Sequence, residues 1–187
     1  MAERRVEQDV EHLVMRARAG DHAAFGELVR IHQHEVFTLA VRLTGDRTLA
    51  ADVTQEALVR AWKSIGRFRG DAAFSTWLHR ITVNAAWTQK TRTLRHQAQH
   101  LDSVVEQVET DLRTDPELAG ERAELRAVIG GALNRLPDQQ RAVVVLKDLY
   151  GWSHKDIAEA LSISVTAAKV RLHRAHLRLR ELLKEAS

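Results

Sequence analysis

Residues 156–183 read DIAEALSISVTAAKVRLHRAHLRLRELL, and this stretch decides the fold of the C-terminal part of the chain. Apolar residues recur at every third or fourth position on both sides of the triplet SIS at 162–164, which indicates two helices joined by a tight turn. Ser153 and Asp156 stand three apart, as in a capping box, so the first helix is expected to begin there. Ser164 is the expected N-cap of the second helix.

The turn between these helices requires an unusual backbone conformation. We expect Ser162 to adopt the left-handed region, where a serine costs about 1 kcal/mol relative to glycine. Small side chains at Ala158 and Ala168 allow the two helices to cross closely. The apolar residues expected to fix the crossing angle are Ile163, Val165, Ala168, Leu172 and Ala175. This arrangement is a helix-turn-helix.

Basic side chains project from the early turns of the second helix, which are the turns that enter the major groove in a helix-turn-helix. The basic residues expected to face base edges are Lys169, Arg171, His173 and Arg174. Arg178 lies farther along, where contact with phosphates is favoured. The alternative is a helical hairpin whose basic face is only solvated. Because the caps, the small residues and the basic face agree, we favour DNA binding.

The composition is that of a globular protein in water. Of the 187 residues 28% are charged and 44% are apolar, and the absence of cysteine excludes disulfides and thiolate metal sites. The first residues, MAERRVEQDVEHLV, are too charged for a secretory signal, and no run of about 18 apolar residues exists. We therefore expect a cytoplasmic protein without a cofactor. The net charge is only +3, but basic residues outnumber acidic ones after Val165, and the reverse holds between Leu101 and Glu124.

The chain is expected to be all-α, with two small helical domains joined by an acidic flexible linker. Pro116 and Pro137 stand at plausible helix starts. The β-branched run AVVVL at 142–146 could be a strand, but its flanks PDQQR and KDLYG favour a short buried helix. The expected limits are 1–95 for the first domain, 96–114 for the linker and 115–187 for the second domain.

Two segments resemble one known protein family. The sequence LPDQQRAVVVLKDLYGWSHKDIAEALSISVTAAKVRLHRAHLRLRELL at 136–183 resembles region 4 of bacterial sigma factors of the extracytoplasmic-function group. The sequence LAADVTQEALVRAWKSIGRFRGDAAFSTWLHRITVNAAWTQKTR at 49–92 resembles region 2 of the same group. The two segments stand in the expected order and, with their flanking helices, cover nearly the whole chain.

The resemblance implies a specificity subunit of RNA polymerase that is no enzyme itself. Region 2 would dock on the clamp helices of the largest polymerase subunit and open the −10 element of the promoter DNA. Region 4 would read the −35 element as duplex, and the acidic linker would thread toward the active-site cleft. Members of the group are commonly held inactive by an anti-sigma factor, which is therefore an expected partner beside the polymerase core.

The resemblance also implies roles for individual residues. In the docking helix, ADVTQEALVRAW, the polar positions are Asp52, Gln55, Glu56 and Arg60. Phe68 and Asn84 match the positions that hold a flipped-out −10 base, a task that needs an aromatic wall and an amide. The residues expected in the core nearby are Trp77, Leu78 and Ile81. Those expected on the phosphate backbone are Arg80, Lys90 and Arg92.

The second helix of the helix-turn-helix departs from the family pattern. Many members have Gly-Thr-Val where this chain has Thr166, Ala167 and Ala168, and a serine where it has Val170. Val170 stands where members often contact DNA; it cannot donate a hydrogen bond, but it can touch a thymine methyl group. The resemblance therefore predicts the fold of region 4 and leaves the −35 sequence open.

Two other interpretations are weighed against this one. A one-component regulator would bind DNA without polymerase, but it would leave the docking helix and the pair Phe68 and Asn84 without a purpose. A metal protein or enzyme would use some of the ten histidines. His96 and His100 have i, i+4 spacing, yet no carboxylate ligand completes a metalloprotease pattern, so no metal is expected.

Overall fold

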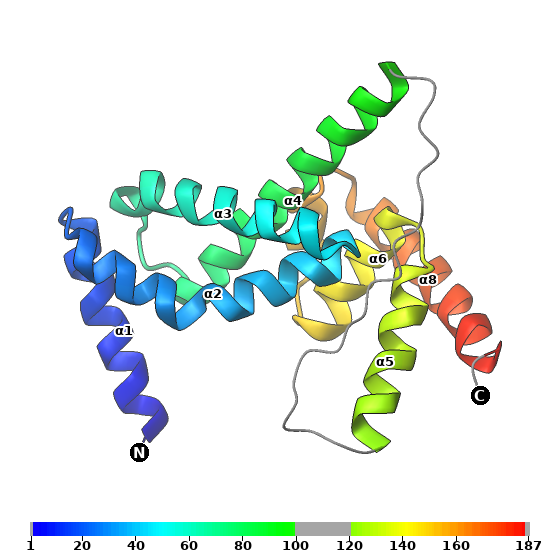
Figure 1. Cartoon of the computed structure of the whole chain (residues 1–187), viewed down its shortest axis with the longest axis horizontal. Helices are drawn as coiled ribbons and strands as arrows, with labels where there is room; N and C mark the ends of the chain where they lie inside the picture. Colours follow the sequence, from blue (N-terminus) through cyan, green and yellow to red (C-terminus); the bar gives the residue numbers. More distant parts are fainter. Residues whose placement is uncertain (1, 100–120, 186–187) are drawn as a thin grey trace. The chain divides into compact units, whose positions relative to one another are not determined.

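The computed structural model describes residues 2–99 and 121–185, and the regular structure in these ranges is entirely helical (Figure 1). The prediction of an all-α fold is confirmed. The N-terminal helices are α1 (Ala2–Arg18), α2 (His22–Thr44), α3 (Arg47–Ser64), the 3₁₀ helix η1 (Ile65–Arg67) and α4 (Phe74–Gln99). The C-terminal helices are α5 (Glu121–Asn134), α6 (Asp138–Val144), the π-helix η2 (Val145–Leu149), α7 (His154–Ala160) and α8 (Val165–Glu185).

Contacts among these helices divide the chain into two compact units. The first unit comprises Met1–Ala40 and Thr48–Arg92, and the second comprises Val41–Arg47 and Thr93–Ser187. The end of α2 and the turn to α3 therefore group with the C-terminal residues. The domain limits expected from the sequence stay a prediction, because most of the linker lies outside the described residues.

The first unit is built on the apolar stripes of α2, α3 and α4. One face of each amphipathic helix leaves water and supplies the core. Its buried members include Leu28, Val36 and Leu39 of α2, Val53, Ala57 and Ala61 of α3, and Leu78 and Val83 of α4. Asp21 caps α2, as its carboxylate accepts a hydrogen bond from the backbone N–H of Ala24 at 3.0 Å. That bond and the guanidinium of Arg16 hold the pKa of Asp21 below its usual value.

The second unit has a core shared by α5, α6 and α8. Its cluster of buried apolar residues is Ala132, Leu133, Leu136, Val144, Ala175 and Leu182. The AVVVL run at 142–146 is buried and helical, as predicted, and it passes from α6 into η2. The backbone of η2 winds as a π-helix, a form that occurs mostly as single turns within α-helices.

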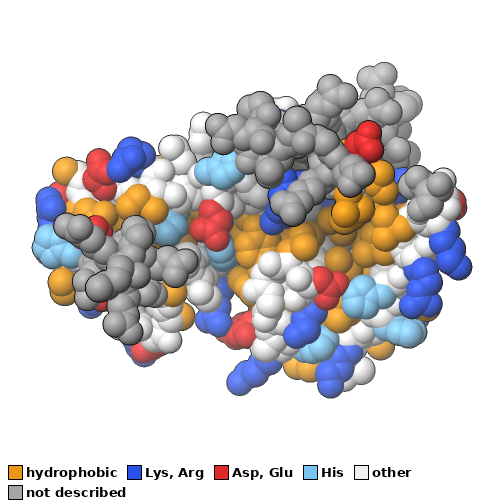
Figure 2. All heavy atoms as spheres, turned by 90° about the horizontal axis from the view of Figure 1, so that it is seen from below, with side chains coloured by type: hydrophobic (Ala, Val, Ile, Leu, Met, Phe, Trp, Pro, Cys, Tyr) orange, Lys and Arg blue, Asp and Glu red, His pale blue; other side chains and the backbone are white. Residues whose placement is uncertain are grey.

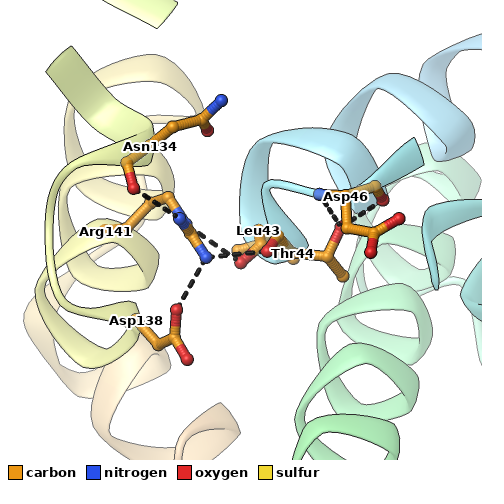
Figure 3. Close-up of polar contacts among 6 residues, drawn as sticks. All are labelled: Leu43, Thr44, Asp46, Asn134, Asp138 and Arg141. Atoms are coloured by element: carbon orange, nitrogen blue, oxygen red, sulfur yellow. Dashed lines mark hydrogen bonds and ion pairs between the residues drawn. The ribbon is translucent and has the colours of Figure 1, made fainter. Parts of the chain in front are cut away.

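One buried charge ties three segments of the second unit together (Figure 3). Arg141 of α6 is only 4% exposed. Its Nη2 donates to the carbonyl oxygen of Thr44 at 2.8 Å and to the carboxylate of Asp138 at 2.7 Å. Its Nε and Nη1 donate to the carbonyl oxygens of Leu43 and Asn134, each at 3.3 Å. Burial lowers the pKa of Arg141 and Asp138 opposes that shift, so the buried guanidinium is compensated on several sides.

Gly45 leaves room for this guanidinium at the end of α2. Its φ is +73°, and a Cβ atom there would lie 2.8 Å from Nη1 of Arg141. Another residue would strain the backbone and displace the guanidinium as well. The last carbonyl groups of a helix lack partners within the helix and carry partial negative charge, so a cation is well placed there.

Helix α7, the turn and α8 form the predicted helix-turn-helix. Ser162 has the expected left-handed backbone, with a φ of +52°. Oγ of Ser153 accepts a hydrogen bond from the backbone N–H of Asp156 at 3.1 Å. Oγ of Ser164 accepts one from the backbone N–H of Ala167 at 3.0 Å. The left-handed turn and both caps are therefore confirmed.

The contact between α7 and α8 uses small side chains, as predicted. Ala158 and Ala168 are 5% and 0% exposed, and Ile157 beside them is 0% exposed. Leu172 and Ala175 belong to the core of the second unit. The contact predicted for Val165 stays a prediction, because this side chain is 40% exposed. It is the first residue of α8 and stands at the edge of the packed surface.

The left-handed turn makes a prediction about stability. Replacing Ser162 by glycine should raise the free energy of unfolding by about 0.5–1 kcal/mol, because glycine has no Cβ to clash at positive φ. Replacing Ser164 by alanine should lower it by about 1 kcal/mol through loss of the N-cap. Urea unfolding of both variants measures the two effects. A destabilised Ser162→Gly variant would contradict the strain assigned to this turn.

Candidate nucleic-acid and polymerase interface

One face of α3 carries the polar residues that the sequence analysis assigned to the polymerase-docking helix. Asp52, Gln55 and Glu56 are exposed, and their spacing puts them on one side of the helix. Arg60 is half-buried at the edge of this side, where its Nε donates to the carboxylate of Glu56 at 2.6 Å. Val59, which is 47% exposed, lies on the same side and was missed from the sequence. Val59 follows Gln55 by four positions and Glu56 by three, and this spacing could have placed it on the same side of the helix from the sequence alone.

Phe68 lies within an aromatic cluster of the first unit. Its side chain is 8% exposed, and its ring centroid is 5.1 Å from that of Trp77. The edge of Phe74 meets it at 6.0 Å with an interplanar angle of 88°. Such contacts are those of a packed aromatic group. A DNA base would therefore reach the Phe68 ring only after a local rearrangement.

The exposed side of α4 carries the other residues predicted for the −10 element. Asn84 and Arg80 are exposed and Lys90 is half-buried, while the side chain of Arg92 lies outside the described residues. Leu78 is in the core as predicted, whereas Trp77 and Ile81 are half-buried.

Trp77 is a candidate that the sequence interpretation assigned to the core. Asn84 follows Trp77 by seven positions, so both lie on one face of α4, about 10 Å apart along the helix axis. Its ring packs against Phe68 on one side while part of it stays accessible. Trp77 thus contacts Phe68 and shares a face of α4 with Asn84. The periodicity of α4 is the signal that could have identified it.

Two histidines flank a glutamate beside this aromatic cluster. Nε2 of His79 lies 3.0 Å from one carboxylate oxygen of Glu35, and Nδ1 of His32 lies 3.7 Å from the other. The His32 ring also lies 5.3 Å from the Phe74 ring. Burial lowers the pKa of His32, and Glu35 opposes the shift. Burial likewise lowers the pKa of His79, where Glu35 raises it and His32 lowers it further.

Most of the basic residues predicted on α8 are presented to solvent. The exposed ones are Lys169, His173, Arg174 and Arg178, and Val170, which was predicted beside them, is exposed as well. Arg171 is half-buried, and its Nη1 is buried without a hydrogen-bond partner among the residues that the structure describes. Arg178 forms an ion pair with Glu181 at 3.3 Å. Figure 2 shows Lys and Arg side chains in blue and His side chains in pale blue, and they gather at the right-hand end of the molecule, where α8 lies.

Comparison with known proteins agrees with this arrangement. Residues 28–96 match the family model of Sigma-70 region 2, and residues 126–179 match that of Sigma-70, region 4. The chain is 35% identical to the RNA polymerase sigma-H factor of Pseudomonas aeruginosa, over 96% of this chain and 98% of that protein. It is 36% identical to the ECF RNA polymerase sigma factor SigM of Mycobacterium tuberculosis, over 88% of this chain and 80% of that protein. The chain belongs to the extracytoplasmic-function sigma factors.

Solved structures of sigma factors share the fold. The sigma factor RpoE of Bartonella quintana, in complex with the anti-sigma factor NepR, matches with a TM-score of 0.67 and 25% identity. That match covers 86% of this sigma factor and 96% of the solved chain. CnrH, in complex with the cytosolic domain of CnrY, matches with a TM-score of 0.59 and 26% identity over 96% of this chain and 99% of that one.

Two further findings concern the described residues alone. Among them, no helix is both long enough and apolar enough to cross a membrane. Nor do three or more histidine, aspartate or glutamate side chains of the described part gather in a way that could hold a metal ion. The side chains of His96 and His100 lie outside the described residues.

The histidine pair predicts that region 2 loses stability in acid. Because burial favours neutral His32 and His79 in the folded state, the unfolded state binds more protons as the pH falls below the ordinary histidine pKa of about 6.5. Their contribution is therefore complete above that pH and is lost toward the lower folded-state pKa. Each group adds a slope of up to about 1.4 kcal/mol per pH unit.

Unfolding of a His79→Gln variant between pH 7.5 and 5 tests this slope. Glutamine can donate to Glu35 and cannot become charged, so the decline in stability should be shallower than in the wild type. His34→Gln is the matched control, since His34 is exposed on the same helix as His32. A decline as steep in His79→Gln as in His34→Gln would show that the buried pair is not responsible.

Proposed function

We propose that this sigma factor directs the RNA polymerase core to specific promoters and starts transcription there. The observation that carries the proposal is that one chain presents two distinct surfaces, the polar side of α3 in region 2 and the basic side of α8 in region 4. Two weak contacts on one polymerase scaffold raise each other's effective concentration. Region 2 would occupy 1–95 and region 4 would occupy 115–187, with 96–114 as the linker.

The exposed side of α3 would bind the clamp helices of the largest polymerase subunit. Asp52, Gln55 and Glu56 offer acceptors and one amide donor toward a partner helix. Val59 adds an accessible apolar side chain one turn after Gln55 and Glu56 on the same side of the helix, and an apolar side chain beside polar ones suits a protein interface. Arg60 holds the carboxylate of Glu56 and thereby limits its rotamers.

The exposed side of α4 would open the −10 element. Asn84 has an amide that can pair with the edge of a flipped base, and the accessible part of Trp77 offers a surface for stacking. Phe68 would pack against the Trp77 ring and hold it in place, or it would contact the base itself after a local rearrangement of the aromatic cluster. The residues proposed to hold the phosphate backbone are Arg80, Lys90 and Arg92.

The early turns of α8 would enter the major groove of the −35 element. Lys169, His173 and Arg174 are exposed there, and arginine can bind guanine in bidentate fashion. Arg178 follows one turn after Arg174 and would hold phosphate after exchanging its partner Glu181. Arg171 has less freedom to reach a base, because part of its guanidinium is buried.

We infer that this sigma factor acts in the cytoplasm, catalyses no reaction of its own and is held inactive by an anti-sigma factor. Two sigma factors of similar fold, RpoE and CnrH, are each in complex with another protein, NepR and the cytosolic domain of CnrY. Promoter-specific transcription in vitro with core polymerase tests the main proposal. Tight binding of the isolated chain to duplex promoter, with no further effect of polymerase, would instead support a one-component regulator.

Substitutions in region 2 should separate polymerase binding from promoter opening. Asn84→Ala should slow open-complex formation about 5- to 150-fold, given about 1–3 kcal/mol for a base contact, and should leave core binding intact. Asp52→Ala combined with Gln55→Ala should weaken core binding first. A core-binding assay beside permanganate footprinting distinguishes the two variants, and equal loss of both activities in both would contradict the separation. At Phe68 the same test should use Phe68→Leu rather than Phe68→Ala, because the ring is buried and its complete removal would leave a cavity.

Substitutions in α8 should separate base recognition from backbone contact. Arg174→Ala should weaken holoenzyme binding to the cognate −35 element about 5- to 150-fold more than to a scrambled one, which corresponds to about 1–3 kcal/mol. Arg178→Ala should weaken both alike and reduce the salt dependence by about one phosphate contact. Fluorescence anisotropy at several salt concentrations measures both effects, and identical behaviour of the two variants would contradict the assignment.

A further inference from the structure

The outward line of α8 differs in chemistry from its two edges. Ala168 and Ala175 are both 0% exposed and define the inner line of the helix. At 3.6 residues per turn, Val170 stands about 200° around the helix from Ala168, which is nearly opposite the core. Between Val165 and Leu177, the part of α8 nearest the turn, the residues on this outward line are Thr166, Val170, His173 and Leu177, all of them exposed.

Cationic side chains flank this line on both sides. Arg174 and Arg178 follow one edge of α8, and Lys169 and Arg180 follow the other. A helix in the major groove meets a phosphate backbone on each side and base edges in the middle. The two cationic edges therefore match duplex DNA, and they suit an apolar protein surface poorly because the cations would lose water there.

Two residues of this line, Val170 and Leu177, are apolar, although folding does not require them to be. Val170 is 43% exposed and Leu177 is 45% exposed, so neither contributes a full side chain to the core. Val170 lies in the early turns that enter the groove, one helical turn after Thr166 and next to Lys169. Among the groups that bases present in the major groove, the apolar one is the C5 methyl of thymine.

We propose that Val170 recognises the C5 methyl group of a thymine in the −35 element, with the methyl group of Thr166 extending the same apolar strip. This inference rests on the proposed function, since it assigns the chemistry that region 4 reads. The cations at the edges supply affinity for any duplex, and the apolar middle favours an A·T pair at the position below it.

The test removes single methyl groups from DNA. A −35 duplex is first selected from a randomised pool with the holoenzyme, and each thymine is then replaced by deoxyuridine, which lacks only the C5 methyl. With wild-type protein, one or two replacements should weaken holoenzyme binding about fourfold, as expected for one methyl group taken from an apolar contact. In Val170→Ala the same replacements should have little effect, because the partner is already lost.

The matched control is Val128→Ala, in which a valine of α5 that is 36% exposed is truncated in the same unit. It should respond to deoxyuridine as the wild type does. The inference is wrong if the selected element contains no A·T pair, if no replacement matters, or if Val170→Ala responds as strongly as Val128→Ala. A holoenzyme without any preference for a selected −35 element would be a different result, since it would overturn the proposed function and this inference with it.

Discussion

The orientation of α8 depends on the close packing of alanines between α7 and α8. Ala158 and Ala168 carry only a methyl group each, so their side chains allow a close approach of the two helices, and Ile157 is buried as well. The left-handed residue at Ser162 lets the chain reverse within one short turn, so that α8 begins directly against α7. These contacts fix which face of α8 is buried. The opposite face, with its apolar middle and cationic edges, is thereby presented to a partner.

Arg141 is a second constraint, and it acts through charge rather than shape. A buried guanidinium that loses one acceptor is costly, because the remaining charge stays desolvated. Here the acceptors come from the end of α2, the end of α5 and the start of α6, so three segments must keep their positions at once. Gly45 belongs to the same constraint, since only its missing side chain allows the guanidinium to approach the helix end.

Local patterns in the sequence predicted much of the region 4 fold. The two serine caps, the left-handed Ser162 and the buried helical AVVVL run depend on residues close in sequence, and all are present. Phe68 could be a core residue or a base contact by its sequence alone, and its burial depends on how the loop before α4 brings its ring against Phe74 and Trp77. Arg141 was likewise missed, since its carbonyl partners at Leu43 and Thr44 stand almost a hundred residues away. The roles of the DNA-facing residues stay predictions.

The division of α8 into edges and middle has a consequence for how promoter preference evolves. Val170 and Thr166 are exposed, so their replacement disturbs neither the core nor the contact with α7. They are also uncharged, so their replacement leaves the attraction to phosphates unchanged. If the outward line of α8 reads the −35 element as proposed, one or two substitutions at Thr166 and Val170 are enough to change the genes under the control of a lineage. The protein keeps its stability and its general affinity for DNA while its set of targets drifts.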